Sequence, residues 1–350
     1  MNIEELTCTT GEWLRGTGRL SDVVISSRVR LARNLVGHAF LASASATERT
    51  EIFRLITDRI CETSVGKDAL LIDIEAADEL DRQLLVERHL ISRQHAAAEG
   101  SRGVCVAPFE TSAVMINEED HLRIQALRSG LSLDTLWDEI SGIDDTLGAV
   151  LQFAFDERLG YLTACPTNVG TGIRVSVMLH LPALQATQEI ERVMRGARDL
   201  RLAVRGLYGE GTDAIGDLYQ ISNQTTLGKS EEEIIRSFGE GIIPKIVEYE
   251  RTAREALSRE RSAQLDDKIW RAFGMLSHAR TIGSDETIAL LSPIRMGIHM
   301  DRFGRFDVGT LNELFLHTQP AHLQKLHGEA LNGEQRSAVR GDYLRKRLSN

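Results

Sequence analysis

Three short apolar segments, 103–108, 111–117 and 121–127, follow one another with only two or three residues between them. Their valines and isoleucines favour strands, and gaps of this length are typical of antiparallel hairpins. Parallel neighbours would need a crossover of about a dozen residues or more, so the three segments must pair antiparallel. This excludes the regular strand–helix alternation of a doubly wound fold.

The segments around these hairpins complete an α+β pattern. Apolar residues at helical spacing predict helices over 47–64 and 77–92, and a third over 133–147. Further strands are expected over 151–156, 174–181, 200–208 and 216–223. The order β-β-β-α-β-β-α-β-β predicts an antiparallel β-sheet with helices packed on one side.

From Ser230 onward the sequence changes to almost continuous helix. Ser230 and Glu233 have the spacing of a capping box, and helical patterns follow over 243–279, 285–297, 311–326 and 337–348. The polar stretch 252–264 separates the α+β pattern from the helical pattern. We therefore predict an α+β domain over 1–255 and a C-terminal all-α domain over 260–350.

Composition restricts the class of protein. The 350 residues are 42% hydrophobic and 26% charged, and the net charge of −10 argues against a general nucleic-acid binder. No apolar run approaches the roughly 18 residues of a membrane helix, and the acidic N-terminus is unlike a signal peptide. The four cysteines, Cys8, Cys61, Cys105 and Cys165, form no CxxC pair. We expect a cytoplasmic protein with neither a disulfide framework nor a structural metal.

The stretch INEEDHLR, residues 116–123, is unusual because three carboxylates follow directly on a buried strand. Adjacent like charges repel, and acidic residues are poor strand formers. The simplest interpretation is a charged turn. The alternative is a cluster that binds a cation.

Arginines recur at strand ends beside small or polar residues. Lysine occurs at only six positions, so most of the 41 basic residues are arginine, an excess that genomic base composition alone can explain. Individual arginines can be structural salt bridges or can bind phosphate with their planar fork. The arginines at strand ends are Arg28, Arg30, Arg123, Arg174 and Arg205. Together they would suit a triphosphate without a P-loop, since TLGKS at 226–230 lacks the leading glycine of a Walker motif.

Four motifs carry a family resemblance. SSRVRLARNL, INEEDHLRIQ, CPTNVGTGIRVSV and RGLYGEG resemble, in order and spacing, segments of the guanidino (phosphagen) kinases, over residues 22–254. Within that family the chain is most similar to bacterial protein-arginine kinases of the McsB type. It begins 25 residues before SSRVR, carries ERHLIS at 87–92 and continues into an extra helical domain.

The resemblance implies a role for each matching residue. Glu119 and Glu210 would grip the acceptor guanidinium as catalytic carboxylates. ATP, with Mg²⁺, would be held by Ser26, Ser27, Arg28, Val29, Arg30, His89, Arg123, Arg174, Val175, Ser176, Val177, Met178, Arg205, Gly206, Leu207, Tyr208 and Gly209. The chemistry agrees, because phosphoryl transfer needs alignment and charge neutralisation. A guanidinium with a pKa above about 12 needs a carboxylate to take its proton.

Four further side chains lie in or near the motifs. Cys165 matches the family's reactive thiol but could equally be a buried small hydrophobe. His121 is expected to be structural. Met115 and Met178 are expected in the core, although Met178 also falls in a stretch that aligns with nucleotide-binding residues.

Three functions follow from the resemblance. The first is ATP-dependent phosphorylation of arginine residues in proteins, in bacterial stress response and quality control. The alternatives are a free-guanidine phosphagen kinase and a catalytically idle adaptor that binds phosphoarginine. A homodimer, an activator protein and a Clp-type protease are expected partners, with no nucleic acid and no membrane.

The C-terminal region departs from the family pattern at one place. Protein-arginine kinases of this type carry an RDxxRA segment that binds phosphoarginine, and the matching stretch here is RSAVRG, from Arg336 to Gly341. Arg336 and Arg340 remain, but Ser337 replaces the aspartate. Because a hydroxyl cannot offer a charge-assisted bond to a guanidinium, we expect weak or absent feedback activation.

Overall fold

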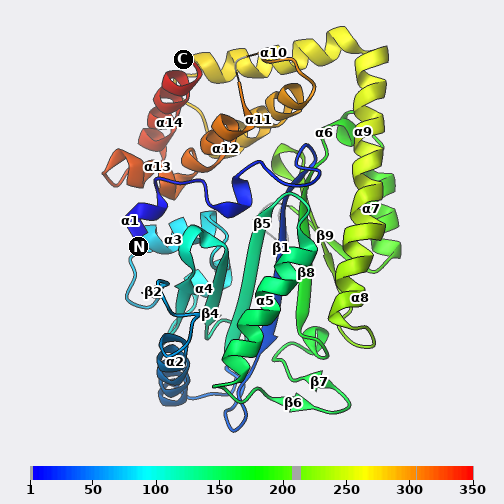
Figure 1. The fold of residues 1–350 in the computed structure, drawn as a ribbon. Helices are drawn as coiled ribbons and strands as arrows, with labels where there is room; N and C mark the ends of the chain where they lie inside the picture. The colour runs from blue at the N-terminus through cyan, green and yellow to red at the C-terminus, as the bar shows by residue number, and fades with distance from the viewer. Residues whose placement is uncertain (1–2, 207–213, 305, 350) are drawn as a thin grey trace.

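The computed structural model describes residues 3–206, 214–304 and 306–349. Its centre is an eight-stranded antiparallel sheet in the order β2-β3-β4-β5-β1-β8-β10-β9 (Figure 1). The strands are β1 Val24–Arg33, β2 Leu70–Asp73, β3 Gly103–Val106, β4 Ser112–Ile116, β5 Leu122–Ser129, β8 Ile173–His180, β9 Leu202–Arg205 and β10 Leu218–Asn223. The hairpin spacing thus predicted β3, β4 and β5 correctly, and the α+β class is confirmed.

One face of the sheet packs against helices. Side chains alternate along each strand, so Val29 and Leu31 of β1 lie in the same core as Val175 and Val177 of β8. The helices that supply the other half of this core are α2 Ala46–Cys61, α5 Leu133–Gly148, α7 Ile190–Asp199, α8 Glu231–Arg236 and α9 Ile243–Glu260. A short α6, Pro182–Ala186, packs on α9.

The opposite face is also covered, but only in part. At the β2–β4 edge α1 Ile3–Leu6, α3 Glu79–Glu87 and α4 Arg93–Ala97 pack on Val104, Val106 and Met115. The prediction of helices on one side was therefore incomplete. Strands β3 and β4 are buried at every residue, so both of their faces need cover.

The C-terminal helices lie over one end of the sheet, at the top of Figure 1. They are α10 Ser262–His278, α11 Ser284–His299, α12 Val308–His317, α13 Pro320–His327 and α14 Gly333–Leu348. Ile288 of α11 and Leu316 of α12 join Trp13, Leu127 and Met178 in a second cluster on this face. Met115 and Met178 are buried, as expected.

Two details differ from the sequence prediction or add to it. The expected strand 151–156 contributes only β6, Phe155–Asp156, which pairs with β7, Gly160–Tyr161. It cannot join the main sheet beside β1, because β5 and β8 already occupy both edges of β1. Among the described helices, none is long and apolar enough to cross a membrane.

Candidate functional site

A large cavity occupies the part of the second sheet face that the helices leave open. Its volume is about 970 Å³. Strands β1, β5, β8, β9 and β10 form its floor, and residues of the α3–α4 region and of the 165–173 loop form its walls.

Seven arginines line this cavity. Five of them lie on the strands of its floor, and we call these the arginine row: Arg28, Arg30, Arg123, Arg174 and Arg205. Strand register brings them together, since Arg30 pairs directly with Arg174 across β1 and β8. Arg28 donates to the Ser176 hydroxyl at 3.4 Å and to Gln220 Oε1 at 3.3 Å. The arrangement places like charges opposite one another, which costs stability when no anion is bound.

The pKa values of Arg28 and Arg30 are lowered in part by this repulsion. Burial and the neighbouring Arg174, Arg123 and Arg205 lower the pKa of Arg28 to about 10. Burial lowers the pKa of Arg30 well below its ordinary value, and Arg28 adds to the effect. A polyanion in the cavity would relieve both, so the row is suited to bind phosphate groups.

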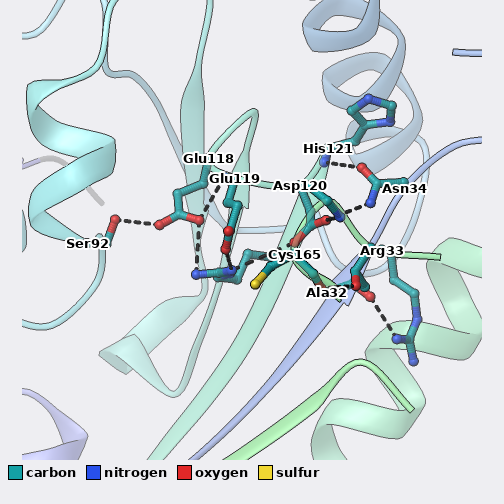
Figure 2. A network of polar contacts seen from close by, with 12 residues as sticks. Ala32, Arg33, Asn34, Ser92, Glu118, Glu119, Asp120, His121 and Cys165 are labelled. Atoms are coloured by element: carbon teal, nitrogen blue, oxygen red, sulfur yellow. Dashed lines mark hydrogen bonds and ion pairs between the residues drawn. The ribbon is translucent and has the colours of Figure 1, made fainter. Parts of the chain in front are cut away.

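Three carboxylates stand beside the row and share Arg123, and Asp120 is the most distant of them, with its Oδ2 3.7 Å from Arg123 Nη2. Arg123 contacts Glu118 at 3.0 Å and Glu119 at 2.8 Å. Glu118 also accepts a hydrogen bond of 2.6 Å from Ser92, as Figure 2 shows. Burial alone would lower the pKa of Arg123, but the carboxylates outweigh it and raise that pKa.

Asp120, the third carboxylate of the motif, has a structural role. It is 0% exposed and accepts hydrogen bonds from Asn34 Nδ2 at 2.6 Å and from the backbone N–H of Ala164 at 2.7 Å. In Figure 2 its carboxylate turns toward Asn34, away from the pair formed by Glu118 and Glu119. The neighbouring His121 is equally structural, because its ring bonds the backbone of Leu35 and Ala39.

His89 reaches the cavity from a strained backbone. It follows the C-terminus of α3 with φ of +60°, in the left-handed region that glycine normally occupies at this position. Burial, with Arg28 and Arg93, lowers its pKa to about 3, so the ring is neutral at physiological pH. Gln125 fixes the backbone by donating to the His89 carbonyl at 2.9 Å.

Cys165 lines the cavity at the start of the 165–173 loop and is partly exposed. Its Sγ lies 3.0 Å from the Thr167 hydroxyl. Gly172 ends the loop with φ of +65°, and a Cβ there would lie 2.8 Å from the Ala32 carbonyl oxygen. Glycine therefore lets the loop pass directly over β1.

The structure places the expected site residues in three groups. The arginine row, His89, Glu119 and Cys165 line one cavity. The side chains of Ser27, Val29, Val175 and Val177 belong to the opposite face: the valines lie in the core, and Ser27 donates to the Gly130 carbonyl. Ser26, Ser176, Met178 and Gly206 are buried outside the cavity lining. Glu210, Leu207, Tyr208 and Gly209 lie outside the described residues.

Several lining residues were not predicted as site residues from the sequence, among them Ser92, Arg93 and Arg201. Ser92 caps α4 and bonds Glu118, and Arg93 begins that helix. Arg201 lies in the turn before β9, four residues ahead of Arg205. The pattern of basic residues could have indicated Arg201. Nothing local indicated Arg93, because the folding of α3 and α4 over the sheet brings it to the cavity.

The C-terminal RSAVRG segment lies on α14 with its arginines bound to backbone. Arg340 is 3% exposed and donates to the carbonyls of Thr318 at 2.7 Å and Ile282 at 2.9 Å. Arg336 donates to the Leu331 carbonyl, and the partly exposed Ser337 hydroxyl to the Gly333 carbonyl. Gly341 is close-packed, since a Cβ there would lie 2.7 Å from the Arg280 carbonyl oxygen.

An antiparallel sheet that presents an arginine row beside paired carboxylates defines a guanidino phosphotransferase, a kinase. The family model for the ATP:guanido phosphotransferase C-terminal catalytic domain matches residues 51–253, and the model for the protein-arginine kinase McsB C-terminal domain matches 262–350. The chain belongs to the protein-arginine kinases of the ATP:guanido phosphotransferase family. The resemblance of the four motifs is thereby confirmed.

Comparison with individual proteins supports the same family. The chain is 46% identical to the protein-arginine kinase of Symbiobacterium thermophilum over 340 residues, and 44% identical to that of Halothermothrix orenii over 338 residues, with 96% of each chain covered in both. Among solved structures, a duplicated taurocyamine kinase from Schistosoma mansoni has a TM-score of 0.61 at 25% identity, covering 73% of this chain and 38% of that one. A lombricine kinase has a TM-score of 0.60 at 26% identity, with 69% of each chain covered.

Proposed function

We propose that the cavity binds Mg-ATP along the arginine row and receives the guanidinium of an arginine residue from another protein, which takes the γ-phosphoryl group. The observation that carries this proposal is the meeting of two opposite charge preferences in one cavity. The row favours a polyanion, and Glu118 with Glu119 favours a cation. Arg123 lies at the boundary between them.

The arginine row would align and neutralise the phosphates. Phosphoryl transfer demands little covalent chemistry of the protein, since positioning and charge stabilisation supply most of the rate. Arg28 and Arg30 are partly buried beside like charges, so each gains more from a phosphate oxygen than an exposed arginine would. Mg²⁺ arrives with ATP and shields the charge that develops on its phosphates.

Glu119 would orient the acceptor and take its proton. As the guanidinium nitrogen forms a bond to the γ-phosphorus, the bond from that phosphorus to the β,γ-bridging oxygen breaks and ADP leaves. The proton lost by the guanidinium passes to the Glu119 carboxylate, which is 36% exposed and can face an incoming side chain. Glu210 is proposed as the second carboxylate of the clamp, by family resemblance alone.

The remaining family expectations are part of the same proposal. We propose the division into a catalytic domain over 1–255 and a regulatory, dimerising domain over 260–350. A role in stress response, an activator protein and a Clp-type protease partner follow from the family and from nothing in the cavity. Cys165 is proposed as a sensitive thiol whose modification would obstruct the cavity that it lines.

The following experiment distinguishes the two possible phosphoryl acceptors, an arginine residue in a protein and free arginine. The protein is incubated with radiolabelled Mg-ATP and either an arginine-containing unfolded protein or free arginine. Acid-labile label on protein, lost in the Glu119→Gln variant, supports the proposal. Label on free arginine alone would show a small-molecule phosphagen kinase instead. No label with either acceptor, and identical behaviour of wild type and variant, would favour a binding protein.

A further inference from the structure

Three consecutive residues at the end of α3 point to three different parts of the molecule. The Glu87 carboxylate accepts hydrogen bonds from the backbone N–H groups of Ala321 at 2.7 Å and His322 at 3.0 Å. These groups begin α13, so a carboxylate from the sheet domain caps a helix of the C-terminal region. Glu87 is 5% exposed, which strengthens these bonds by excluding water.

His322 joins Glu87 to the next residue. Its Nδ1 lies 2.7 Å from Glu87, and its Nε2 lies 3.0 Å from Arg88 Nη1. Because Arg88 can only donate, Nε2 must accept and Nδ1 must carry the proton, which is the neutral ring. Burial and Arg88 lower the pKa of His322 well below its ordinary value, in agreement with this tautomer.

Arg88 is held equally firmly. It is 0% exposed, donates through Nε to Glu110 at 2.8 Å and through Nη1 to the Thr9 carbonyl at 2.9 Å. The N-terminal segment, the β3–β4 connection and α13 therefore all meet at one guanidinium. The side chain directly before His89 is therefore fixed by contacts with three segments.

His89, the third residue, has a strained backbone conformation, and its side chain lines the cavity. The Leu90 N–H bonds to the Leu85 carbonyl and the His89 N–H to the Val86 carbonyl, both at 3.0 Å, which are the two bonds of a Schellman motif with histidine in the glycine position. A non-glycine residue in this conformation persists only where its surroundings fix it. The Trp13 ring, 4.5 Å from the His89 ring, adds a further support and itself contacts Phe315 of α12.

We infer that Glu87 and His322 form an interdomain latch that positions His89 in the cavity, so that the docking of α13 sets the affinity for the nucleotide. Glu87 is a positioning residue, because it does not line the large cavity and lies two residues before His89, which does. The inference rests on the proposed function in that the cavity is taken to bind ATP.

A second cavity supports the coupling. It has a volume of about 510 Å³, lies between α3 and α4 on one side and α11 and α13 on the other, and includes Glu87 in its lining. Val86 and Arg93 line both this cavity and the larger one. A shift of α13 therefore moves a wall that the two cavities share.

The chain offers a matched control for Glu87. Glu250 is also a buried carboxylate that accepts two backbone N–H bonds at the start of a helix, from Ala183 at 3.1 Å and Leu184 at 3.0 Å in α6. Burial raises the pKa of both carboxyls. Glu250 lies outside the lining of the large cavity. Loss of charge at either carboxylate removes the same kind of helix cap. Only Glu87 is close to His89 in the chain.

The experiment compares Glu87→Gln with Glu250→Gln in the full chain, by calorimetric titration with Mg-ATP and by steady-state kinetics. We expect Glu87→Gln to raise the Kd and the KM for ATP about fivefold or more, with kcat at saturating ATP little changed. Glu250→Gln should lose stability but keep the wild-type Kd. Should Glu87→Gln fail to fold, His322→Leu removes the ring and leaves the two backbone bonds, and it should raise the Kd in the same direction.

Each outcome bears on one idea only. Equal Kd values in Glu87→Gln, Glu250→Gln and wild type would overturn the latch. So would a loss of kcat with unchanged KM in Glu87→Gln. A wild-type protein that does not bind Mg-ATP at all would instead refute the proposed function of the cavity.

Discussion

Arg123 lies between the two charge regions of the cavity and contacts both carboxylates, Glu118 and Glu119. Its guanidinium contacts Glu119, the carboxylate proposed to receive the guanidinium of a substrate. A bound triphosphate would attract Arg123 toward the row and weaken its contact with Glu119. Binding of ATP would thereby expose the acceptor carboxylate.

The Glu119→Gln variant tests this view of the carboxylate. We expect phosphoryl transfer to fall by about 10²-fold to 10⁴-fold, because the amide cannot take the proton. The Kd for Mg-ATP should stay equal or decrease, since Arg123 loses a competing anion. Kinetics and calorimetric titration measure the two effects separately.

Glu139→Gln provides the control, because Glu139 also holds an arginine, Arg128, at 2.8 Å but lies outside the cavity lining. It should leave transfer and ATP affinity unchanged. Wild-type kcat in Glu119→Gln, or a clear weakening of ATP binding, would contradict the assigned role.

At this scale the sequence predicted side-chain direction better than side-chain partners. Alternation along β1 explains why Arg28 and Arg30, two residues apart, lie on one face. The acidic motif was recognised, but its members could not be separated. Asp120 turns inward because it meets Asn34, which lies 86 residues away in the chain. A contact between residues so far apart cannot be predicted from the local sequence around Asp120.

The pairing of β1 with β8 places Arg30 opposite Arg174, an arrangement that favours function over stability. The variant Arg30→Met should therefore be more stable than wild type without ligand. The melting temperature should rise by a few degrees, which corresponds to about 1 kcal/mol in a chain of this size. The stabilisation that saturating Mg-ATP gives the wild type should largely disappear.

Arg128→Met is the comparison for this variant. Arg128 lies on β5 and pairs with Glu12 at 3.4 Å and Glu139 at 2.8 Å, so it has partners to lose and no like charge to relieve. Its melting temperature should fall while the ATP-induced shift persists. A ligand-free Arg30→Met protein less stable than wild type would contradict the argument from repulsion. Both melting temperatures are measured by calorimetry.

The α14 segment gives a second prediction at the scale of the element. Ser337 is partly exposed, and its neutral hydroxyl donates to the Gly333 carbonyl of its own helix, so it offers a ligand no charge. Free phosphoarginine should stimulate the wild-type kinase weakly or not at all. Ser337→Asp should gain stimulation, and Ser337→Asn, equal in size but neutral, should not. Strong stimulation of the wild type, measured by titrating phosphoarginine against kinase activity, would refute the prediction.

Elements formed by neighbours in sequence were predictable, and those formed by distant segments were not. Turn lengths determined the pairing of β3, β4 and β5. The insertion of β1 between β5 and β8 depends on burying Val29 and Leu31 against α5, about a hundred residues later. Likewise, α3 showed its helical period in the sequence, but not that Glu87 would cap α13.

Taken as a whole, the molecule buries an unusual share of its titratable groups where its layers meet. The histidines whose pKa is lowered, with burial as the largest cause, are His89, His95, His121, His180, His299, His317 and His322. They lie in the sheet domain, in the C-terminal helices and at the junction of the two. Burial therefore favours the uncharged form of these seven rings in the folded protein near neutral pH.

This burial predicts loss of stability in mild acid. An unfolded histidine takes a proton near pH 6.5, whereas the folded rings of His89, His95, His299 and His317 stay neutral to about pH 4 or below. Between these values the unfolded chain binds more protons, so the free energy of unfolding decreases as pH falls. Glu87, Asp144 and Glu250, whose pKa values are raised, act in the opposite direction, because the folded carboxyls take protons first.

The seven histidines outnumber the three carboxyls. The urea concentration at the unfolding midpoint should therefore decrease as the pH is lowered from about 7 to about 5. His299→Gln removes one titrating ring and should make the dependence on pH less steep by one proton. A midpoint that is constant or rises over this interval would show that the carboxyls outweigh the histidines. Urea titrations of both proteins at several pH values distinguish these outcomes, since the slope of stability against pH counts the protons directly.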